Sequence, residues 1–335
     1  MNYNQLPKIE LHLHLDCSLS YKVVQKIDPT ITFKEYQHSF IAPPKCTDLV
    51  DYLSRAVKGF QLMQTKEQLR LVTLDLLEQL KADNVIYAEI RFAPLLHIAK
   101  GLTPVEVVKT VNDAVTEGMQ QIDVEARLIL CTLRHYSEEE SMETIQLVEQ
   151  FKGTNVVGFD IAGDEAGFPV KNHEKAFAYA KEKDIYCTAH AGEAKGPDSV
   201  REVLQHFHPS RIGHGTRSAE DDTLLDFLKK ENIHLEVCPT SNIQTNVFDR
   251  IEDHSANKIY NAGVSMSINT DSRTITPVTL SSEYTLMEKV FQWEKAHFLK
   301  CNLEAVAHSF CSDELKETLK QKINNAYTNV GLYLK

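Results

Sequence analysis

The sequence predicts an α/β protein: a (β/α)8 TIM barrel with a helical lid inserted after strand 1 and extra helices at its C-terminal end. Three observations lead to this prediction. Eight short apolar runs end in small or polar residues, helical patterns separate most of them, and the Gly-rich phosphate motifs of open nucleotide-binding sheets are absent. The eight runs cover residues 8–16, 85–94, 125–135, 156–165, 185–193, 211–216, 233–242 and 264–272.

The segments between these runs have the period of amphipathic helices. Apolar residues recur at intervals of three and four in residues 197–207 and 219–232. Strands that alternate with helices form a parallel sheet, and eight such units close into a barrel. The alternative, an open doubly wound sheet, commonly carries GxGxxG or GxxxxGK[ST], and neither motif occurs in the chain. The barrel is therefore favoured.

The connection between the first two runs is longer than a barrel needs. About 70 residues separate them, against a dozen or more in an ordinary crossover. Residues 46–63 and 66–84 both have helical period, and the second segment can serve as the crossover helix. Because the βα loops of a barrel lie over its active site, residues 20–65 are predicted to form a helical cap. An insertion packed at the barrel edge is the alternative.

The remaining helical pattern lies at the end of the chain. Residues 282–335 include "EYTLMEKVFQWEKAHFL" and "DELKETLKQKINNAYTN", which are predicted to add helices to the outer ring. A closed barrel often exceeds roughly 200–250 residues as one domain. Residues 1–335 are therefore expected to form a single domain.

Composition and charge argue against several classes of protein. The formal net charge is −11, which disfavours a nucleic-acid partner, and a small neutral or cationic substrate fits better. No run approaches the roughly 20 apolar residues of a membrane helix, and no signal-peptide pattern opens the sequence. Seven cysteines without CxxC spacing are typical of reduced thiols, so a cytoplasmic location is expected. The sequence carries no signal for oligomeric state.

Unusual polar residues gather at the ends of the predicted strands, which share one face of a barrel. His12 and His14 are two apart in a strand, so both point to the same side, toward the barrel mouth. Imidazole and carboxylate groups bind zinc, and a catalytic zinc keeps an open position for water. The predicted ligands of one zinc ion per chain are His12, His14, His190 and Asp271.

The HxH pair alone would be weak evidence for a metal, because histidine tolerates burial when its N–H groups are satisfied. The hypothesis depends on the pair occurring together with His190, His214 and Asp271 at other strand ends. A bound zinc would lower the pKa of a water, with Glu193 placed to protonate the substrate and His214 to hold the hydroxide. A salt-bridge role for Glu193 at the barrel rim is the alternative.

Two other zinc-hydrolase patterns, HExxH and HxE…PCxxC, are absent. The segment "EVCPTSN" is most simply the buried end of a strand. The outlying histidines are interpreted as structural or surface residues, namely His97, His135, His173, His206, His208 and His254.

The segments "HLHLD", "GDE", "HAGE", "GHG" and "NTD", in this order and spacing, resemble the adenosine deaminase family of the amidohydrolase superfamily. The match runs essentially end to end and includes "ILCTLRH" and "HLEVCPTSN". The resemblance implies a zinc (β/α)8 barrel that hydrolyses the 6-amino group of adenosine or 2′-deoxyadenosine. The products are inosine or 2′-deoxyinosine and ammonia, which places the reaction in purine salvage.

The resemblance also implies a role for each residue that carries the chemistry. Glu193 matches the acid that protonates purine N1, and His214 the histidine that positions and stabilises the attacking hydroxide. Asp271 would also accept a proton from that hydroxide. Attack at C6 places charge on N1, so Glu193 must be protonated when the substrate binds. The zinc ligands that match are His12, His14, His190 and Asp271.

On the substrate side, Asp16 matches the carboxylate that binds the ribose hydroxyl, with His14 close enough to share that contact. Gly163 matches the backbone N–H near purine N3. Two positions depart from the family pattern. Cys17 replaces a glycine, which would strain the backbone if that position needs a positive φ. Ser272 replaces an aspartate that holds purine N7, and its hydroxyl can donate to N7 without any pKa shift.

Several substrates and two other functions compete with this interpretation. AMP is disfavoured because Asp16 would face the 5′-phosphate with like charge, and free adenine would leave Asp16 without a partner. Nucleosides modified at the 5′ position, such as methylthioadenosine or aminodeoxyfutalosine, stay open as alternatives. A catalytically silent nucleoside-binding protein and a zinc hydrolase of another amide or ester are the competing hypotheses from other classes.

Overall fold

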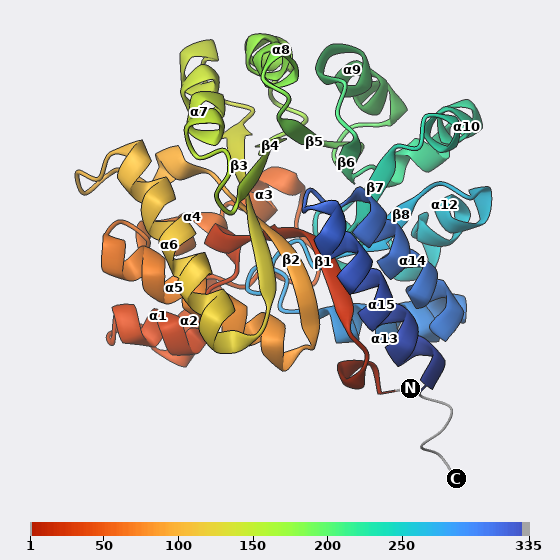
Figure 1. The fold of residues 1–335 in the computed structure, drawn as a ribbon, viewed down its shortest axis with the longest axis horizontal. Coiled ribbons are helices and arrows are strands. Elements are labelled where there is room, and N and C mark those ends of the chain that lie inside the picture. The colour runs from red at the N-terminus through yellow and green to blue at the C-terminus, as the bar shows by residue number, and fades with distance from the viewer. Residues whose placement is uncertain (1, 330–335) are drawn as a thin grey trace.

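Eight parallel strands form the centre of the molecule (Figure 1). The structure, a computed structural model, describes residues 2–329. Each strand pairs in parallel with the next one along the chain, and a backbone bridge from Leu13 to Asp271 links the region beyond the last strand to the first. The predicted (β/α)8 barrel is thereby confirmed. The strands are β1 Lys8–His14, β2 Val85–Phe92, β3 Glu125–Leu133, β4 Val156–Ala162, β5 Tyr186–Ala191, β6 Arg211–His214, β7 His234–Val237 and β8 Met266–Ile268.

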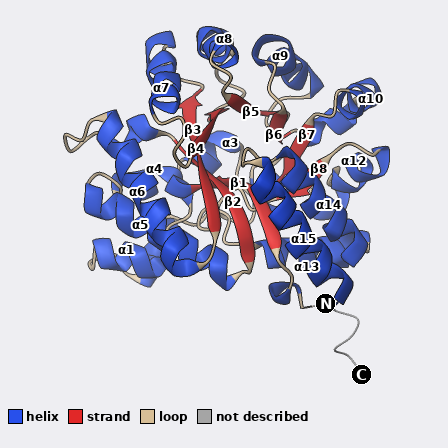
Figure 2. Cartoon of the chain, in the orientation of Figure 1, coloured by secondary structure: helices blue, strands red, loops and turns tan. Residues whose placement is uncertain are grey.

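Helices surround the strands as an outer layer (Figure 2). Their starts follow capping signals in the sequence: Thr103 and Ser137 each form a capping box with a glutamate three residues later, and Pro104 opens its helix. The helix predicted at residues 197–207 is present with the same bounds. The helices of this layer are α5 Lys66–Ala82, α6 Pro104–Ile122, α7 Glu138–Gln150, α8 Glu174–Glu182, α9 Pro197–Phe207, α10 Asp222–Lys230 and α12 Ala256–Ala262.

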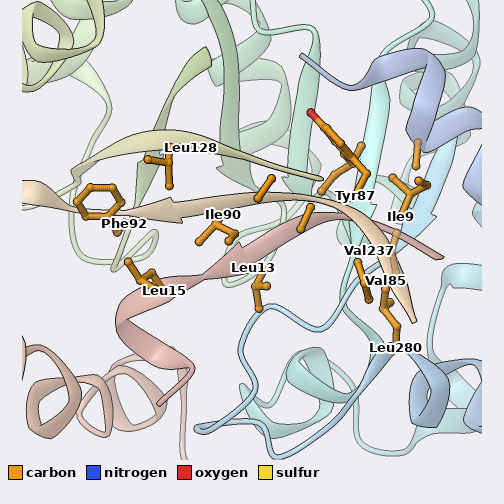
Figure 3. Close-up of a cluster of buried hydrophobic side chains, with 14 of the residues drawn as sticks. Ile9, Leu13, Leu15, Val85, Tyr87, Ile90, Phe92, Leu128, Val237 and Leu280 are labelled. Atoms are coloured by element: carbon orange, nitrogen blue, oxygen red, sulfur yellow. The ribbon is translucent and has the colours of Figure 1, made fainter. Parts of the chain in front are cut away.

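The apolar core lies between the strands and this helical layer. Figure 3 shows side chains of β1, β2, β3 and β7 meeting there, with Leu13, Ile90 and Leu128 among them. These three side chains are fully buried, which is expected where helices cover a parallel sheet. Packing in the core fixes the positions of the strand ends. The polar residues at those ends are therefore held rigidly.

The segment between β1 and β2 folds into short helices before the crossover helix α5. The single helical pattern seen at residues 46–63 corresponds to two helices, because the chain turns at Ser54 and Arg55. The prediction of α5 within residues 66–84 is confirmed. The short helices are α1 Tyr21–Ile27, α2 Phe33–Ser39, α3 Leu49–Leu53 and α4 Ala56–Gln61.

The end of the chain adds α13 Leu280–Phe291, α14 Lys295–His308 and α15 Asp313–Asn329. The pattern "EYTLMEKVFQWEKAHFL" is divided between α13 and α14, because Gln292 adopts a left-handed φ of 57° that ends α13. Helix α14 packs against β1, so the C-terminal helices lie beside the first strand (Figure 1). Residues 330–335 of the predicted helical stretch lie outside the described residues. Over the part that the structure describes, no helix is both long and apolar enough to cross a membrane.

The strands end earlier than the sequence patterns suggested, and the polar residues that follow them lie in loops and short helices. Asp16 belongs to a 3-10 helix at Leu15–Cys17, just after β1. The interpretation of "EVCPTSN" as a strand end was wrong for its second half, because β7 stops at Val237 and Pro239 opens helix α11, Pro239–Gln244. This short helix carries polar side chains toward the barrel mouth.

Candidate active site

A cavity of about 440 Å³ lies at the C-terminal ends of the strands, beneath α3 and α4. Its floor contains the histidines and acids that the sequence singled out, and its roof contains apolar residues of the two short helices, among them Leu53, Val57 and Phe60. The predicted site residues that line it are His14, Asp16, Gly163, His190, Glu193, His214, Asp271 and Ser272.

Four side chains in the floor converge closely enough to hold a metal ion. One ligand atom from each of His12, His190, His214 and Asp271 lies within 4.8 Å of every other. His14 lies beside this group, with Nε2 3.2 Å from Nε2 of His190 and 3.6 Å from Oδ1 of Asp271. All four predicted ligands are therefore brought together, and His214 is a fifth neighbour.

Backbone geometry brings Asp271 to the two histidines of β1. The N–H of Asp271 donates to the carbonyl of His12 at 3.0 Å, and the N–H of His14 donates to the carbonyl of Asp271 at 2.8 Å. Asp271 and His214 both adopt left-handed backbone conformations, with φ of 65° and 59°. Such conformations are uncommon for residues other than glycine and gather at functional sites, where the surrounding structure imposes them.

Two buried carboxylates orient the histidines of the cluster. Oε2 of Glu236 accepts from Nδ1 of His12 at 2.8 Å, and Oδ2 of Asp160 lies 3.0 Å from Nδ1 of His190. The guanidinium of Arg91 contacts both carboxylates at 2.7 Å, and all three charged side chains are fully buried. A carboxylate at Nδ1 turns the Nε2 lone pair toward a metal and strengthens the ligand.

The donor set fits a metal ion. Nε2 of His12 is buried, and no hydrogen-bond partner for it exists among the described residues. A buried polar atom without a partner is costly unless a ligand supplies one. Imidazole nitrogens together with a carboxylate oxygen suit zinc.

The residues that hold these histidines carried no functional signal in the sequence. Arg91, Asp160 and Glu236 each occur as a charged residue within an apolar central strand. Since a charge is rarely buried without a partner, this pattern predicts buried ion pairs, although it does not say which residues pair.

The acids of the floor differ in their tendency to hold a proton. Burial, and then the negative charge of Asp271, raise the pKa of Glu193 well above its ordinary value. Burial would also raise the pKa of Asp271, but the adjacent side chain of His12 and the other neighbouring imidazoles hold it well below its usual range. Oε2 of Glu193 lies 3.6 Å from Nε2 of His214. The surroundings thus favour the protonated form of Glu193 and the ionised form of Asp271.

Asp271 and Ser272 also contact residues outside the predicted set. Ser241 on α11 donates to Oδ2 of Asp271 at 2.6 Å, and the hydroxyl of Tyr52 on α3 lies 3.4 Å from the same oxygen. Oγ of Ser272 accepts from the N–H of Thr276 at 3.0 Å. Ser241 occurs in the segment first interpreted as a plain strand end, and Tyr52 carried no signal in the sequence.

Asp16 and Gly163 lie at the edge of the same cavity. Burial raises the pKa of Asp16 to about 6, and Nε2 of His97 lies 3.9 Å from its Oδ2. Gly163 has φ of 99°, a conformation that favours glycine. Cys17, by contrast, is not among the residues with positive φ, so its replacement of glycine imposes no strain of that kind. All seven cysteines are free thiols, as the sequence predicted.

Comparison with known proteins gives consistent results. A family model described as adenosine deaminase matches residues 7–326. The adenosine deaminase of Clostridium perfringens is 36% identical over 96% of this chain and 99% of its own length.

Two solved structures also match. The adenine deaminase of Arthrobacter aurescens has a TM-score of 0.88 and 25% identity, with 96% of this chain and 98% of that chain covered. The N6-methyl-AMP deaminase of Arabidopsis thaliana has a TM-score of 0.86 and 26% identity, with 97% and 98% covered. The fold, the polar cluster at the strand ends and these matches agree, and the chain belongs to the adenosine deaminase family.

Proposed function

We propose that this chain catalyses the hydrolytic deamination of adenosine and 2′-deoxyadenosine to the inosine nucleosides and ammonia, with one zinc ion per chain. The observation that carries the proposal is the pair Glu193 and Asp271, whose pKa values the surroundings push in opposite directions within one cavity. Two acids whose pKa values differ in this way can serve as the proton donor and the proton acceptor of one reaction.

The zinc ligands in this proposal are His12, His14, His190 and Asp271. When bound, the ion would lower the pKa of a water, so that a nucleophile is available near neutral pH. His214, which lies beside Glu193, would orient the attacking water, and Asp271 would accept a proton from it.

Glu193 would protonate N1 of the purine. Its raised pKa favours the protonated carboxyl, and burial limits the access of water that would compete for the proton. Negative charge develops on N1 as C6 is attacked, so a donor at that atom stabilises the transition state more than the bound substrate.

The rest of the cavity supports a nucleoside as substrate. Asp16 would accept a hydrogen bond from a ribose hydroxyl, with His14 beside it, and Gly163 would offer its N–H near N3. The Thr276 N–H donates to Oγ of Ser272, and the Ser272 hydroxyl would in turn donate its own hydrogen to N7. Among the described residues that line the cavity there is no lysine or arginine to hold a phosphate, which favours nucleosides over nucleotides.

The short helices between β1 and β2 would act as the cap. Leu49, Leu53, Val57 and Phe60 line the cavity from above, which supports a role for residues 20–65 in enclosing the substrate. Cap and barrel would belong to one domain spanning residues 1–335, and the reduced cysteines support a cytoplasmic enzyme.

A second candidate is deamination of an adenosine modified at the 5′ position, such as methylthioadenosine or aminodeoxyfutalosine. The apolar residues Val57, Phe60, Leu96 and Leu133 line the same cavity as Asp16 and could accommodate an apolar 5′ substituent.

A panel of ammonia-release assays would test both candidates. Wild type and Glu193→Ala, each loaded with zinc, would be given adenosine, 2′-deoxyadenosine, adenine, AMP, methylthioadenosine and aminodeoxyfutalosine. We expect the highest kcat/KM for adenosine and 2′-deoxyadenosine, and a loss of about 10²–10⁴-fold in Glu193→Ala because a positioned acid contributes that much. No release from any of the six compounds would contradict the proposal, and a preference for methylthioadenosine would favour the second candidate.

The metal assignment needs its own measurement. Wild type should contain about one zinc per chain, and His12→Ala should contain much less, because a catalytic site holds its ion with about three or more protein ligands. His173→Ala is the matched control, since His173 is also buried but contacts Ser141 and the carbonyl of Arg134 instead of the cluster. Equal zinc content in wild type and His12→Ala would rule out His12 as a ligand.

A further inference from the structure

A chain of hydrogen bonds links His214 to a histidine that the sequence analysis interpreted as structural. It begins at helix α12, where the N–H of Ala256 donates to Nδ1 of His254 at 3.0 Å. A backbone N–H can only donate, so Nδ1 of His254 is an acceptor. His254 is buried, and burial lowers its pKa to about 3, so the ring is neutral and its one hydrogen lies on Nε2.

That hydrogen determines the orientation of the next side chain. Nε2 of His254 lies 3.2 Å from Oδ1 of Asn242 on α11, so the carbonyl oxygen of the amide accepts from His254. The amide nitrogen of Asn242 must then face the other way, where it lies 3.1 Å from Nδ1 of His214. An amide NH2 group only donates, and Nδ1 of His214 is therefore an acceptor.

His214 consequently differs from the histidines that face carboxylates. A ring nitrogen that accepts a hydrogen bond carries no hydrogen, so with Nδ1 accepting, the hydrogen of His214 lies on Nε2. At His12 the neighbour of Nδ1 is the carboxylate of Glu236, which only accepts; the hydrogen then lies on Nδ1 and the Nε2 lone pair is free. His190 has the same arrangement with Asp160. Two histidines thus present lone pairs to the cluster, and His214 presents a donor.

We propose that His254 is a positioning residue that acts through Asn242 to hold the hydrogen of His214 on Nε2. His214 is then a hydrogen-bond donor to the reacting centre and not a metal ligand, and His14 takes the remaining ligand position. The proposal rests on the proposed function only in assigning that donor to the attacking water. Both Asn242 and His254 are buried, so water does not compete with the chain of bonds.

Nuclear magnetic resonance can test the hydrogen position directly. The zinc-loaded protein would be labelled with 15N-histidine, and the His214 signals would be assigned by their absence from a His214→Gln sample. We expect wild type to show the hydrogen of His214 on Nε2. In Asn242→Asp, the new carboxylate accepts from Nδ1, so the hydrogen should move to Nδ1. A wild-type spectrum with the hydrogen on Nδ1 would overturn the proposal.

Kinetics on the same variants separate positioning from simple structural support. Asn242→Asp keeps the size of the side chain, and we expect kcat to fall about 100-fold while KM changes less than about threefold. His254→Ala should lower kcat about tenfold and cause no further loss when combined with Asn242→Asp, since both act through one chain of bonds. A kcat for Asn242→Asp within about twofold of wild type would contradict the proposal.

The matched control is His234→Ala. His234 is as buried as His254, but its ring nitrogens contact the hydroxyls of Ser265 and Ser267, away from the cavity. We expect a similar loss of stability, with kcat and the His214 signals unchanged. If wild type released no ammonia from adenosine, the proposed function would fail, whereas the hydrogen position of His214 would still be decided by the spectra.

Discussion

The floor of the cavity and the short helices above it are stabilised by different forces. In the floor, buried charges fix the side chains: Arg91 contacts Asp160 and Glu236 at 2.7 Å, and those carboxylates contact His190 and His12. Removing one partner of a buried ion pair is strongly destabilising, because the other charge is left without compensation.

The short helices are attached mainly by neutral contacts, together with exposed ion pairs such as Lys22–Glu78, which contribute little. The side-chain amide of Gln244 donates to the carbonyls of Ala42 and Pro43, and the amide of Asn246 donates to the carbonyl of Thr47. A small apolar cluster completes the attachment, formed by Ala42, Cys46, Leu49, Tyr52 and Ile275. Neutral hydrogen bonds contribute about 0.5–1.5 kcal/mol each, so this region is held more weakly than the floor.

The difference indicates that the floor and the short helices have different functions. The floor needs fixed geometry, because a metal and a proton donor act only at defined positions. The segment above must let a substrate in and then enclose it, which requires attachments that can open. Substitutions in the floor should therefore change metal binding and kcat, and those in the segment above should have smaller effects.

Among the substitutions that compare the two regions, Asp160→Asn should have the largest effect. The substitution removes the charge that faces His190 and Arg91, and we expect zinc affinity, measured by competition with a chelator, to fall about 10- to 100-fold together with kcat. Glu89→Gln is the control, because it breaks the equally buried pair with Arg211 without contacting a histidine of the cluster. Equal loss of zinc in both variants would show that general destabilisation, and not the orientation of His190, is responsible.

Tyr52→Phe should have an intermediate effect. Tyr52 lies on α3, one of the short helices above the cavity, and its hydroxyl contacts the floor. Its hydroxyl lies 2.7 Å from Oγ1 of Thr276 and 3.4 Å from Oδ2 of Asp271. Loss of one long hydrogen bond to a charged group should lower kcat about tenfold with little change in KM.

Tyr36→Phe is the matched control for that prediction. Tyr36 is also buried in the upper segment, on α2, and its hydroxyl donates to the carbonyl of Leu19 at 2.8 Å. We expect its kcat to equal that of wild type. If Tyr52→Phe raised KM and left kcat unchanged, the hydroxyl would bind substrate and would not hold Asp271.

The pH dependence of kcat/KM should reveal Asp16, which lies between the two regions. Burial raises its pKa to about 6, and the ionised form accepts a ribose hydroxyl much more strongly than the protonated form, so kcat/KM should fall up to about fourfold from its plateau by pH 5.5. Asp16→Asn should remove this acid limb and lower the plateau. If Asp16→Asn kept the same fall of kcat/KM at acid pH, that fall would be due to the titration of another group.

The same shift has a consequence for stability. Because the folded pKa of Asp16 exceeds the unfolded value of 3.8, stability is lost as the pH rises through about 6. Thermal unfolding of Asp16→Asn should therefore show a gain over wild type at pH 7.5 that disappears at pH 3.5. A gain that did not depend on pH would contradict the raised pKa.

Cys17→Gly should have the smallest effect. Cys17 has no positive φ, so glycine relieves no strain there and only adds conformational freedom to the unfolded chain. We expect a loss of about 0.5–1 kcal/mol in the free energy of unfolding, measured by denaturant titration, with kcat/KM within about twofold of wild type. A clear gain in stability would show that the position prefers glycine.

Several features could be predicted from the sequence because their signals are local. The period of residues 197–207 predicted α9 with its observed bounds, and "DELKETLKQKINNAYTN" coincides with α15. The spacing of His12 and His14 placed both side chains on one face of β1, and the family pattern singled out Glu193. Breaks inside longer patterns were missed, as at Gln292, because one left-handed residue leaves the apolar period almost unchanged.

The sequence by itself determined the order of strands and helices, the types of residue at the strand ends and therefore the family of the chain. Only the tertiary structure decided which groups control those residues. Glu236 reaches His12 across 224 positions of sequence, and Asn242 reaches His214 across 28. Periodicity and spacing describe one element at a time, whereas the ring nitrogen that carries a hydrogen depends on a neighbour that closure of the barrel brings into contact.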